Sequence, residues 1–148
     1  MFGLGPKKGE DGTYTWTLPM GNSKLAGISA DDIGPVAYGI FKAGDAYVGK
    51  AVGIMGEALT LEEMCAKIAS AYGLGSVKYN PIEPDAYRAL GFPGADELGN
   101  MFQIYRDFER EVLAARSAEE ARKLHPGLKN FDQFLSAKKD AVLASMSS

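Results

Sequence analysis

Residues 60–79 read TLEEMCAKIASAYGLGSVKY, and this stretch predicts a helix followed by a short strand. Thr60 and Glu63 have the spacing of a capping box, in which each side chain accepts a hydrogen bond from the backbone N–H of the other residue. Behind them, apolar residues recur at the spacing of one helix face: Leu61, Met64, Cys65, Ile68 and Tyr72. Gly73 is typical of the position just after a helix end. Residues 76–79 then have the composition of a strand, which Pro81 ends.

A second strand is expected before this helix. Residues 47–54 combine β-branched residues with glycines, as in a strand that other backbone approaches closely, and Gly56 closes the segment. The resulting order of strand, helix and strand is typical of α/β proteins.

The N-terminal part adds another strand and another helix. Tyr14–Leu18 (YTWTL) is rich in threonine and aromatic residues and predicts a strand. Residues 24–28 are expected to return beside it as a hairpin. Ser29 and Asp32 resemble a second capping box, with Asp in the place of Glu. Apolar residues follow at helical spacing and predict a helix that ends at residues 43–44.

The C-terminal half shows only helical patterns. Residues 95–115 predict the longest helix of the chain. Ser117 and Glu120 have capping-box spacing, and Asn130 is expected to cap a last helix that runs to Val142. The predicted fold class is therefore mixed α/β (α+β), with short strands and a hairpin in the N-terminal half and helices in the C-terminal half.

Length and composition indicate one globular domain. The chain has 148 residues, of which 46% are hydrophobic and 24% charged, and both values are close to the average of soluble proteins. Residues 1–12 are rich in glycine and charge and are expected to form a flexible lead-in. Residues 13–148 are then expected to form a single domain.

Charge and hydropathy narrow the choice of partners. A net charge of −3 offers no general electrostatic basis for binding nucleic acid. No signal-peptide pattern is present, and no stretch approaches the roughly 20 apolar residues that span a bilayer. We therefore predict a cytoplasmic chain that binds neither nucleic acid nor a membrane. Cys65 is the single cysteine, which excludes an internal disulfide, and no cluster of Cys and His has the spacing of a zinc site.

Two patterns resemble catalytic or phosphate-binding motifs. Residues 44–50 (GDAYVGK) match the start of a phosphate-binding P-loop, but a predicted helix precedes them and Ala51 stands where such a loop needs Ser or Thr. Tyr38 and Lys42 have the Tyr-x-x-x-Lys spacing of short-chain dehydrogenases, yet no glycine-rich fingerprint follows a strand to hold a nicotinamide beside them. We interpret the first as a turn and the second as an exposed pair on a helix, and we predict no catalytic residues.

Other reactive residue types have structural interpretations. His125 precedes Pro126 at a predicted helix end, where a positively charged side chain interacts favourably with the helix dipole. Cys65 lies on an apolar helix face and is interpreted as a buried hydrophobic residue rather than a nucleophile. No metal site is predicted, and no cofactor-binding residue can be assigned.

An aromatic and methionine stripe is the best site candidate. It combines the loop at residues 91–94 with the helix that follows, and the candidate pocket residues are Phe92, Met101, Phe102 and Tyr105. Two interpretations are open: these side chains form the core of a helix pair, or they form the wall of a pocket for a planar or apolar ligand.

Several stretches, in the right order, resemble one protein family. They are residues 28–34 (ISADDIG), 47–57, 91–102 (GFPGADELGNMF) and 130–135 (NFDQFL). The chain, from about residue 11 to residue 142, is similar to the C-terminal portion of NmrA-like proteins, which are atypical extended relatives of short-chain dehydrogenases and include NADP(H)-sensing redox regulators. The resemblance does not include the N-terminal half of the family's proteins, which carries the glycine-rich dinucleotide-binding loop.

This resemblance implies a partial Rossmann-type sheet and a substrate-side domain, with the segment from Phe92 to Tyr105 closing over the nicotinamide end of the cleft. It implies NADP as the cofactor of the full-length family and none for the isolated chain. The implied function is that of a redox sensor in transcriptional regulation, in which cofactor occupancy changes binding to a regulatory protein.

Two functions follow as alternatives. The first is a non-catalytic binding module for a protein partner or a small apolar ligand, which a large exposed apolar face would support. The second is the substrate-binding part of an oxidoreductase for small carbonyl or quinone substrates, which Tyr38 beside a nicotinamide would support. We also expect a homo-oligomer, because strands at residues 14–18 and 48–54 would present unpaired edges.

Overall fold

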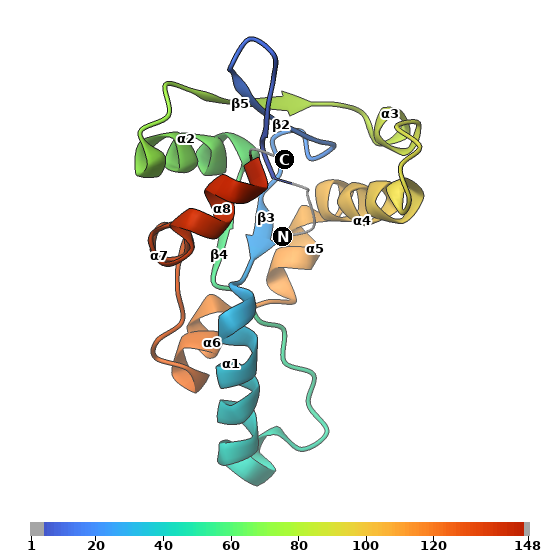
Figure 1. Cartoon of the computed structure of the whole chain (residues 1–148). Coiled ribbons are helices and arrows are strands. Elements are labelled where there is room, and N and C mark those ends of the chain that lie inside the picture. Colours follow the sequence, from blue (N-terminus) through green and yellow to red (C-terminus); the bar gives the residue numbers. More distant parts are fainter. Residues whose placement is uncertain (1–4, 147–148) are drawn as a thin grey trace.

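The computed structural model describes residues 5–146, in which short strands alternate with helices up to β5 and only helices follow (Figure 1). The strands are β1 (Lys7–Lys8), β2 (Tyr14–Leu18), β3 (Leu25–Gly27), β4 (Glu57–Leu59) and β5 (Val77–Pro81). The helices are α1 (Ala30–Ala43), the 3-10 turn η1 (Gly44–Tyr47), α2 (Leu61–Tyr72), α3 (Pro84–Arg88), α4 (Ala95–Asp107), α5 (Glu109–Ala114), α6 (Ala118–Leu124), α7 (Phe131–Ala137) and α8 (Lys139–Met146). The predicted mixed α/β class is confirmed.

The strands form two separate small sheets. In the first, β2 lies between β1, to which it is antiparallel, and β5, to which it is parallel. In the second, β3 pairs with β4 in antiparallel register. The predicted hairpin between residues 14–18 and 24–28 is therefore wrong, because β3 takes a partner far along the chain. The edge-strand reason for self-association also fails for β2, which has a neighbour on each side.

The predicted lead-in, residues 1–12, is part of the fold where the structure describes it. Lys7 and Lys8 pair with Thr15 and Tyr14, and the backbone N–H of Gly9 donates to the carbonyl of Thr13 at 2.8 Å. Residues 5–12 thus contribute strand β1, which pairs with β2 in a hairpin. Residues 1–4 lie outside the described part of the chain.

The strand expected at residues 47–54 is also wrong. Its beginning is the turn η1, and the rest is an irregular segment with one isolated bridge, from Ile54 to Ser117. Gly49 has a φ of 71°, which a strand does not allow. At Gly53 an added Cβ would lie 1.8 Å from the carbonyl oxygen of Ala115. The glycines therefore allow this segment to contact residues 115–117 rather than to join a sheet.

The predicted helix caps at Thr60, Ser117 and Asn130 are confirmed, but the one predicted at Ser29 does not form. Thr60 and Glu63 form the reciprocal capping box that begins α2, and Gly73 ends this helix with a φ of 64°. Asn130 forms a second complete capping box with Gln133. The helix predicted at 95–115 is instead interrupted at Phe108, whose φ of −120° is not helical, and the last helix is interrupted at Lys138.

The apolar residues gather in two clusters of different size. The larger one joins β2, α2, α4, α7 and α8, and its most buried members include Trp16, Leu18, Met20, Leu61, Ile68, Phe102, Leu135 and Met146. The smaller one lies between α1 and α6 and consists of Val36, Ala121 and Leu128. We call α1, η1, residues 48–56 and α6 the arm, because they extend away from the remaining elements, which we call the body (Figure 1).

None of the helices in residues 5–146 is long and apolar enough to cross a membrane.

Candidate functional site

The predicted aromatic stripe lies where α4 packs on α3. Tyr87 of α3 contacts Phe92 and Phe102 edge to face, with ring centroids 5.6 and 5.7 Å apart. Phe102 is only 3% exposed and belongs to the large core, while Phe92 and Met101 are half-buried at its margin. The position of Phe102 is that expected for a core residue.

Tyr105 lies one turn further along α4 and is half-buried. The guanidinium of Arg116 lies over its ring at 5.7 Å from the centroid, and the Nη1 of Arg116 donates to the carbonyl of Val112 at 2.8 Å. Arg116 also lines a cavity between the arm and the end of α5. Tyr105 is therefore linked to this cavity only through Arg116 and is not part of its lining.

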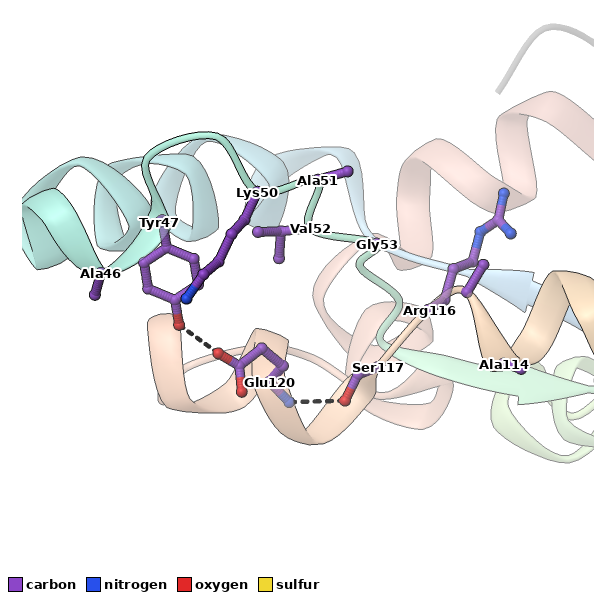
Figure 2. A pocket seen from close by; sticks show the side chains of 11 residues that line it. Ala46, Tyr47, Lys50, Ala51, Val52, Gly53, Ala114, Arg116, Ser117 and Glu120 are labelled. Atoms are coloured by element: carbon purple, nitrogen blue, oxygen red, sulfur yellow. Dashed lines mark hydrogen bonds between the residues drawn. The ribbon is translucent and has the colours of Figure 1, made fainter.

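Figure 2 shows this first cavity, which has a volume of about 450 Å³. Lys50 and Tyr47 extend towards α6, and the Tyr47 hydroxyl donates to the carboxylate of Glu120. This hydrogen bond raises the pKa of Tyr47 above its usual 10.0 and lowers the pKa of Glu120 below 4.5. The backbone N–H of Glu120 in turn donates to Ser117 Oγ at 3.0 Å. The lining of this cavity thus combines the charged groups of Lys50, Arg116 and Glu120 with small apolar residues.

The same region contains residues 44–50, which resemble a P-loop in sequence. A helix turn precedes Lys50, and an irregular segment follows it. Since a P-loop requires a helix N-terminus after its lysine, the interpretation of this stretch as a turn is confirmed.

A second cavity, of about 150 Å³, lies among β2, the β3–β4 pair, α2 and α7. It is lined mostly by apolar side chains, which are Trp16, Leu25, Ile28, Leu59, Met64, Phe131 and Phe134, together with Ser29, Glu57 and Lys129. We call it the apolar cavity. Sequence patterns did not indicate it, because its walls come from segments more than a hundred residues apart along the chain.

A buried carboxylate joins the arm to the body. Asp32 is 1% exposed, and its two oxygens accept from the backbone N–H of Lys129 at 2.8 Å and from Lys129 Nζ at 2.6 Å. The Nε2 of His125 lies 3.8 Å from the same carboxylate. Burial acts to raise the pKa of Asp32, but the hydrogen bonds and charge of Lys129 outweigh it, so that the pKa lies below 3.8.

This pairing replaces the capping box expected from Ser29 and Asp32. The Ser29 side chain makes no capping hydrogen bond, and the carboxylate of Asp32 bonds to Lys129, 97 positions later in the chain. His125 does occupy the C-cap of α6. Its position beside Asp32 was not visible in the sequence.

Cys65 is 2% exposed, and burial raises the pKa of its thiol to about 11. A thiol of this kind is protonated at neutral pH and is a weak nucleophile, in agreement with its interpretation as a core residue. Within residues 5–146, no group of three or more His, Cys, Asp and Glu side chains is placed to hold a metal ion.

The fold of this chain matches one portion of several larger proteins of known structure. A crystal structure of NmrA, a negative transcriptional regulator, in complex with NADP superimposes with a TM-score of 0.68 and 21% sequence identity, over 93% of this chain and 49% of that one. A structure of NmrA with NAD gives a TM-score of 0.69 over the same shares. A Staphylococcus aureus protein described as a nucleoside-diphosphate-sugar epimerase gives 0.66 at 21% identity, over 82% of this chain and 43% of that one.

The amino-acid sequence identifies the family to which the chain belongs. Residues 2–135 match the model of the NmrA-like family, so the chain belongs to this family. It spans about half the length of the solved structures that it resembles.

Proposed function

We propose that this chain is the non-catalytic recognition part of an NmrA-like regulator, and that NADP(H) binding depends on a nucleotide-binding half packed against its arm. The observation that carries the proposal is the exposed apolar face of α1. Tyr38 is 68% exposed and Phe41 80% exposed, and Val48, which follows η1, is 74% exposed. Large apolar side chains exposed along one helix and the turn after it are typical of an interface.

The geometry of α1 separates this face from the packed one. At about 3.6 residues per turn, Ile33, Tyr38 and Phe41 lie on one side of the helix. Asp32 and Val36, which are buried, lie on the other side, where α6 packs. We call Ile33, Tyr38, Phe41 and Val48 the α1 face. These side chains are exposed, whereas the opposite side of α1 packs against α6.

The length of the chain indicates the partner. The NmrA structures that bind NADP or NAD are about twice as long as this chain. A nucleotide-binding half of that kind, in the same polypeptide or in another, is the partner that we infer for the α1 face. Such a contact would couple cofactor occupancy to the recognition part, as expected of a regulator that senses NADP(H).

The alternative is the substrate-binding part of an oxidoreductase for small carbonyl or quinone substrates. Tyr38 and Lys42 keep the spacing of a catalytic pair, and Tyr38 lies on the same exposed face. One structural neighbour is described as a nucleoside-diphosphate-sugar epimerase. In this alternative, Tyr38 would donate a proton to a substrate held beside the nicotinamide.

Calorimetric titration of NADPH into the 148-residue chain tests the proposal. We expect no tight binding, because the backbone amides that hold a pyrophosphate come from a glycine-rich loop that this chain does not contain. Micromolar binding would contradict the proposal. NADPH oxidation with a quinone or an aldehyde that Tyr38→Phe abolishes would establish the enzymatic alternative instead.

A further inference from the structure

We infer that α1 of this chain pairs with α1 of a second copy, antiparallel and about a two-fold axis. The inference rests on the proposed function, because it specifies what covers the α1 face while no nucleotide-binding half is bound. The outer side of this helix is complementary to itself in shape and in charge, and these two properties select the second copy and its orientation.

Large side chains occupy the C-terminal part of the outer side of α1. Tyr38 is 68% exposed and Phe41 80% exposed. At about 3.6 residues per turn, both lie on the side of the helix opposite Val36, which is buried against α6. Covering two such rings with another surface removes apolar area from water, which favours association.

The N-terminal part of the same side carries small residues. Ala30 and Gly34 are exposed and lie in line with Phe41, since they precede it by about three and about two helical turns. A Cβ added at Gly34 would point into open space. Another helix can therefore approach the backbone of α1 closely at this position.

An antiparallel pair brings the large and the small parts together. When Gly34 of one copy faces Phe41 of the other, the two-fold axis passes between residues 37 and 38. Tyr38 then faces Ala37 of the second copy. Each large ring packs against a small residue, which is the self-complementary contact that a two-fold axis requires. A parallel pair would instead place Phe41 against Phe41 and Gly34 against Gly34.

The charges of α1 favour the same orientation. Asp31 lies in the first turn and Lys42 in the last, so the antiparallel pair brings Lys42 of one copy near Asp31 of the other. Asp31 also pairs with Lys138 of its own chain, but its side chain remains 52% exposed. In a parallel pair, each of these charges would lie beside its own copy, and the helix dipoles would align instead of opposing each other.

Sedimentation equilibrium of the 148-residue chain tests the pairing. We expect a dimer whose dissociation constant rises about tenfold or more in Gly34→Gln, because the new side chain takes the place of Phe41 of the second copy. The variant should fold, since position 34 is open and glutamine forms helices more readily than glycine. Ala71→Gln, at an exposed position of α2, is the matched control and should leave the dimer unchanged.

Disulfide cross-linking tests the antiparallel register. Ala37→Cys places a thiol beside the two-fold axis, and we expect it to form an intermolecular disulfide under mild oxidation. Lys42→Cys should not, because the antiparallel register separates the two copies of residue 42 by roughly 13 Å along the helix axes. The native Cys65 is 2% exposed and does not compete. Ser76→Cys, at an exposed position outside α1, controls for random collision.

A chain that sediments as a monomer at its highest soluble concentration would overturn the inference. An unchanged dissociation constant in Gly34→Gln would also overturn it, as would a Lys42→Cys disulfide that forms as readily as that of Ala37→Cys. Failure here is distinct from failure of the proposed function. A monomeric chain would leave the α1 face open to a nucleotide-binding half, whereas micromolar NADPH binding would contradict the proposed function without changing the dimer.

Discussion

The body and the arm of this protein are stabilised in different ways. The body has a core of large side chains from several elements, with Tyr87 packed between Phe92 and Phe102. The arm has a small core, in which Val36 of α1 and Ala121 of α6 pack with Leu128 of the turn that follows α6. Its attachment depends on the buried Asp32–Lys129 pair and on close backbone contacts, such as that of Gly53 with Ala115.

This difference suggests different roles for the two parts: the body provides most of the stability, and the arm provides surface for binding. Hydrophobic burial, the main stabilising contribution in folding, is concentrated in the body. The arm instead exposes much of its apolar surface, including Phe41 and Val48. We therefore expect the body to tolerate little change in its core, and the arm to unfold locally before the body does.

The largest effect is expected for Phe102→Ala in the body. Removing a buried aromatic ring leaves a cavity and should cost about 3–5 kcal/mol in the free energy of unfolding, measured by denaturant unfolding. The exposed Phe108, on the boundary of α4 and α5, offers the control Phe108→Ala, which should change stability by about 0.5 kcal/mol or less. A small loss for Phe102→Ala would favour the interpretation of Phe102 as a pocket wall.

Asp32→Asn should weaken the attachment of the arm. Removing one partner of a buried ion pair costs about 3 kcal/mol, and hydrogen exchange should accelerate in α1 and α6 more than in α2. Asp31→Asn is the control, because Asp31 is half-exposed and pairs with Lys138 at the surface, where such pairs contribute about 0–1 kcal/mol. Equal acceleration in α2 would show that arm and body unfold together.

The pH dependence of this effect has a definite sign. The pKa of Asp32 is lowered by folding, so its contribution is fully present above the unfolded pKa of about 3.9. It is lost as the pH falls through the folded pKa. The stability difference between wild type and Asp32→Asn should therefore be constant near neutrality and shrink below about pH 4.

Phe41→Ser should change association rather than stability. Without a nucleotide-binding half, we expect the purified chain to pair through its α1 face, as a homo-oligomer in sedimentation. Phe41 is 80% exposed, so its replacement should alter the free energy of unfolding by about 0.5 kcal/mol or less while shifting the chain towards monomer. Phe108→Ser, which removes an exposed phenylalanine outside the arm, should leave association unchanged.

Tyr105→Phe should have the smallest effect. The ring keeps its contacts with the core and with Arg116, so stability should stay within about 0.5 kcal/mol of wild type. The measurement is again denaturant unfolding. A loss above about 2 kcal/mol would instead indicate a buried hydrogen bond of the hydroxyl and would assign Tyr105 to the core.

The candidate site illustrates the limits of sequence patterns. The stripe of Phe92, Met101, Phe102 and Tyr105 was visible because its helical residues recur within two turns, yet this periodicity is the same for a core and for a pocket wall. The apolar cavity was not visible, since Ser29 and Phe131 approach each other only through folding. Whether the stripe is core or pocket wall is the question that Phe102→Ala and Tyr105→Phe address.

Two helix caps with both partners in one helical turn were determined by the sequence alone. Thr60 with Glu63, and Asn130 with Gln133, form the capping boxes that their spacing predicts, because the backbone of a single helix brings these groups together. The family match along the chain belongs here too.

Features that depend on distant partners were decided only by the tertiary structure. Residues 24–28 were expected to pair with β2, but Leu25–Gly27 pairs with Glu57–Leu59. Asp32 has the spacing to cap its own helix, but the carboxylate bonds to Lys129 instead. A buried charge is stable only beside the opposite charge, and local spacing cannot show which distant residue supplies it.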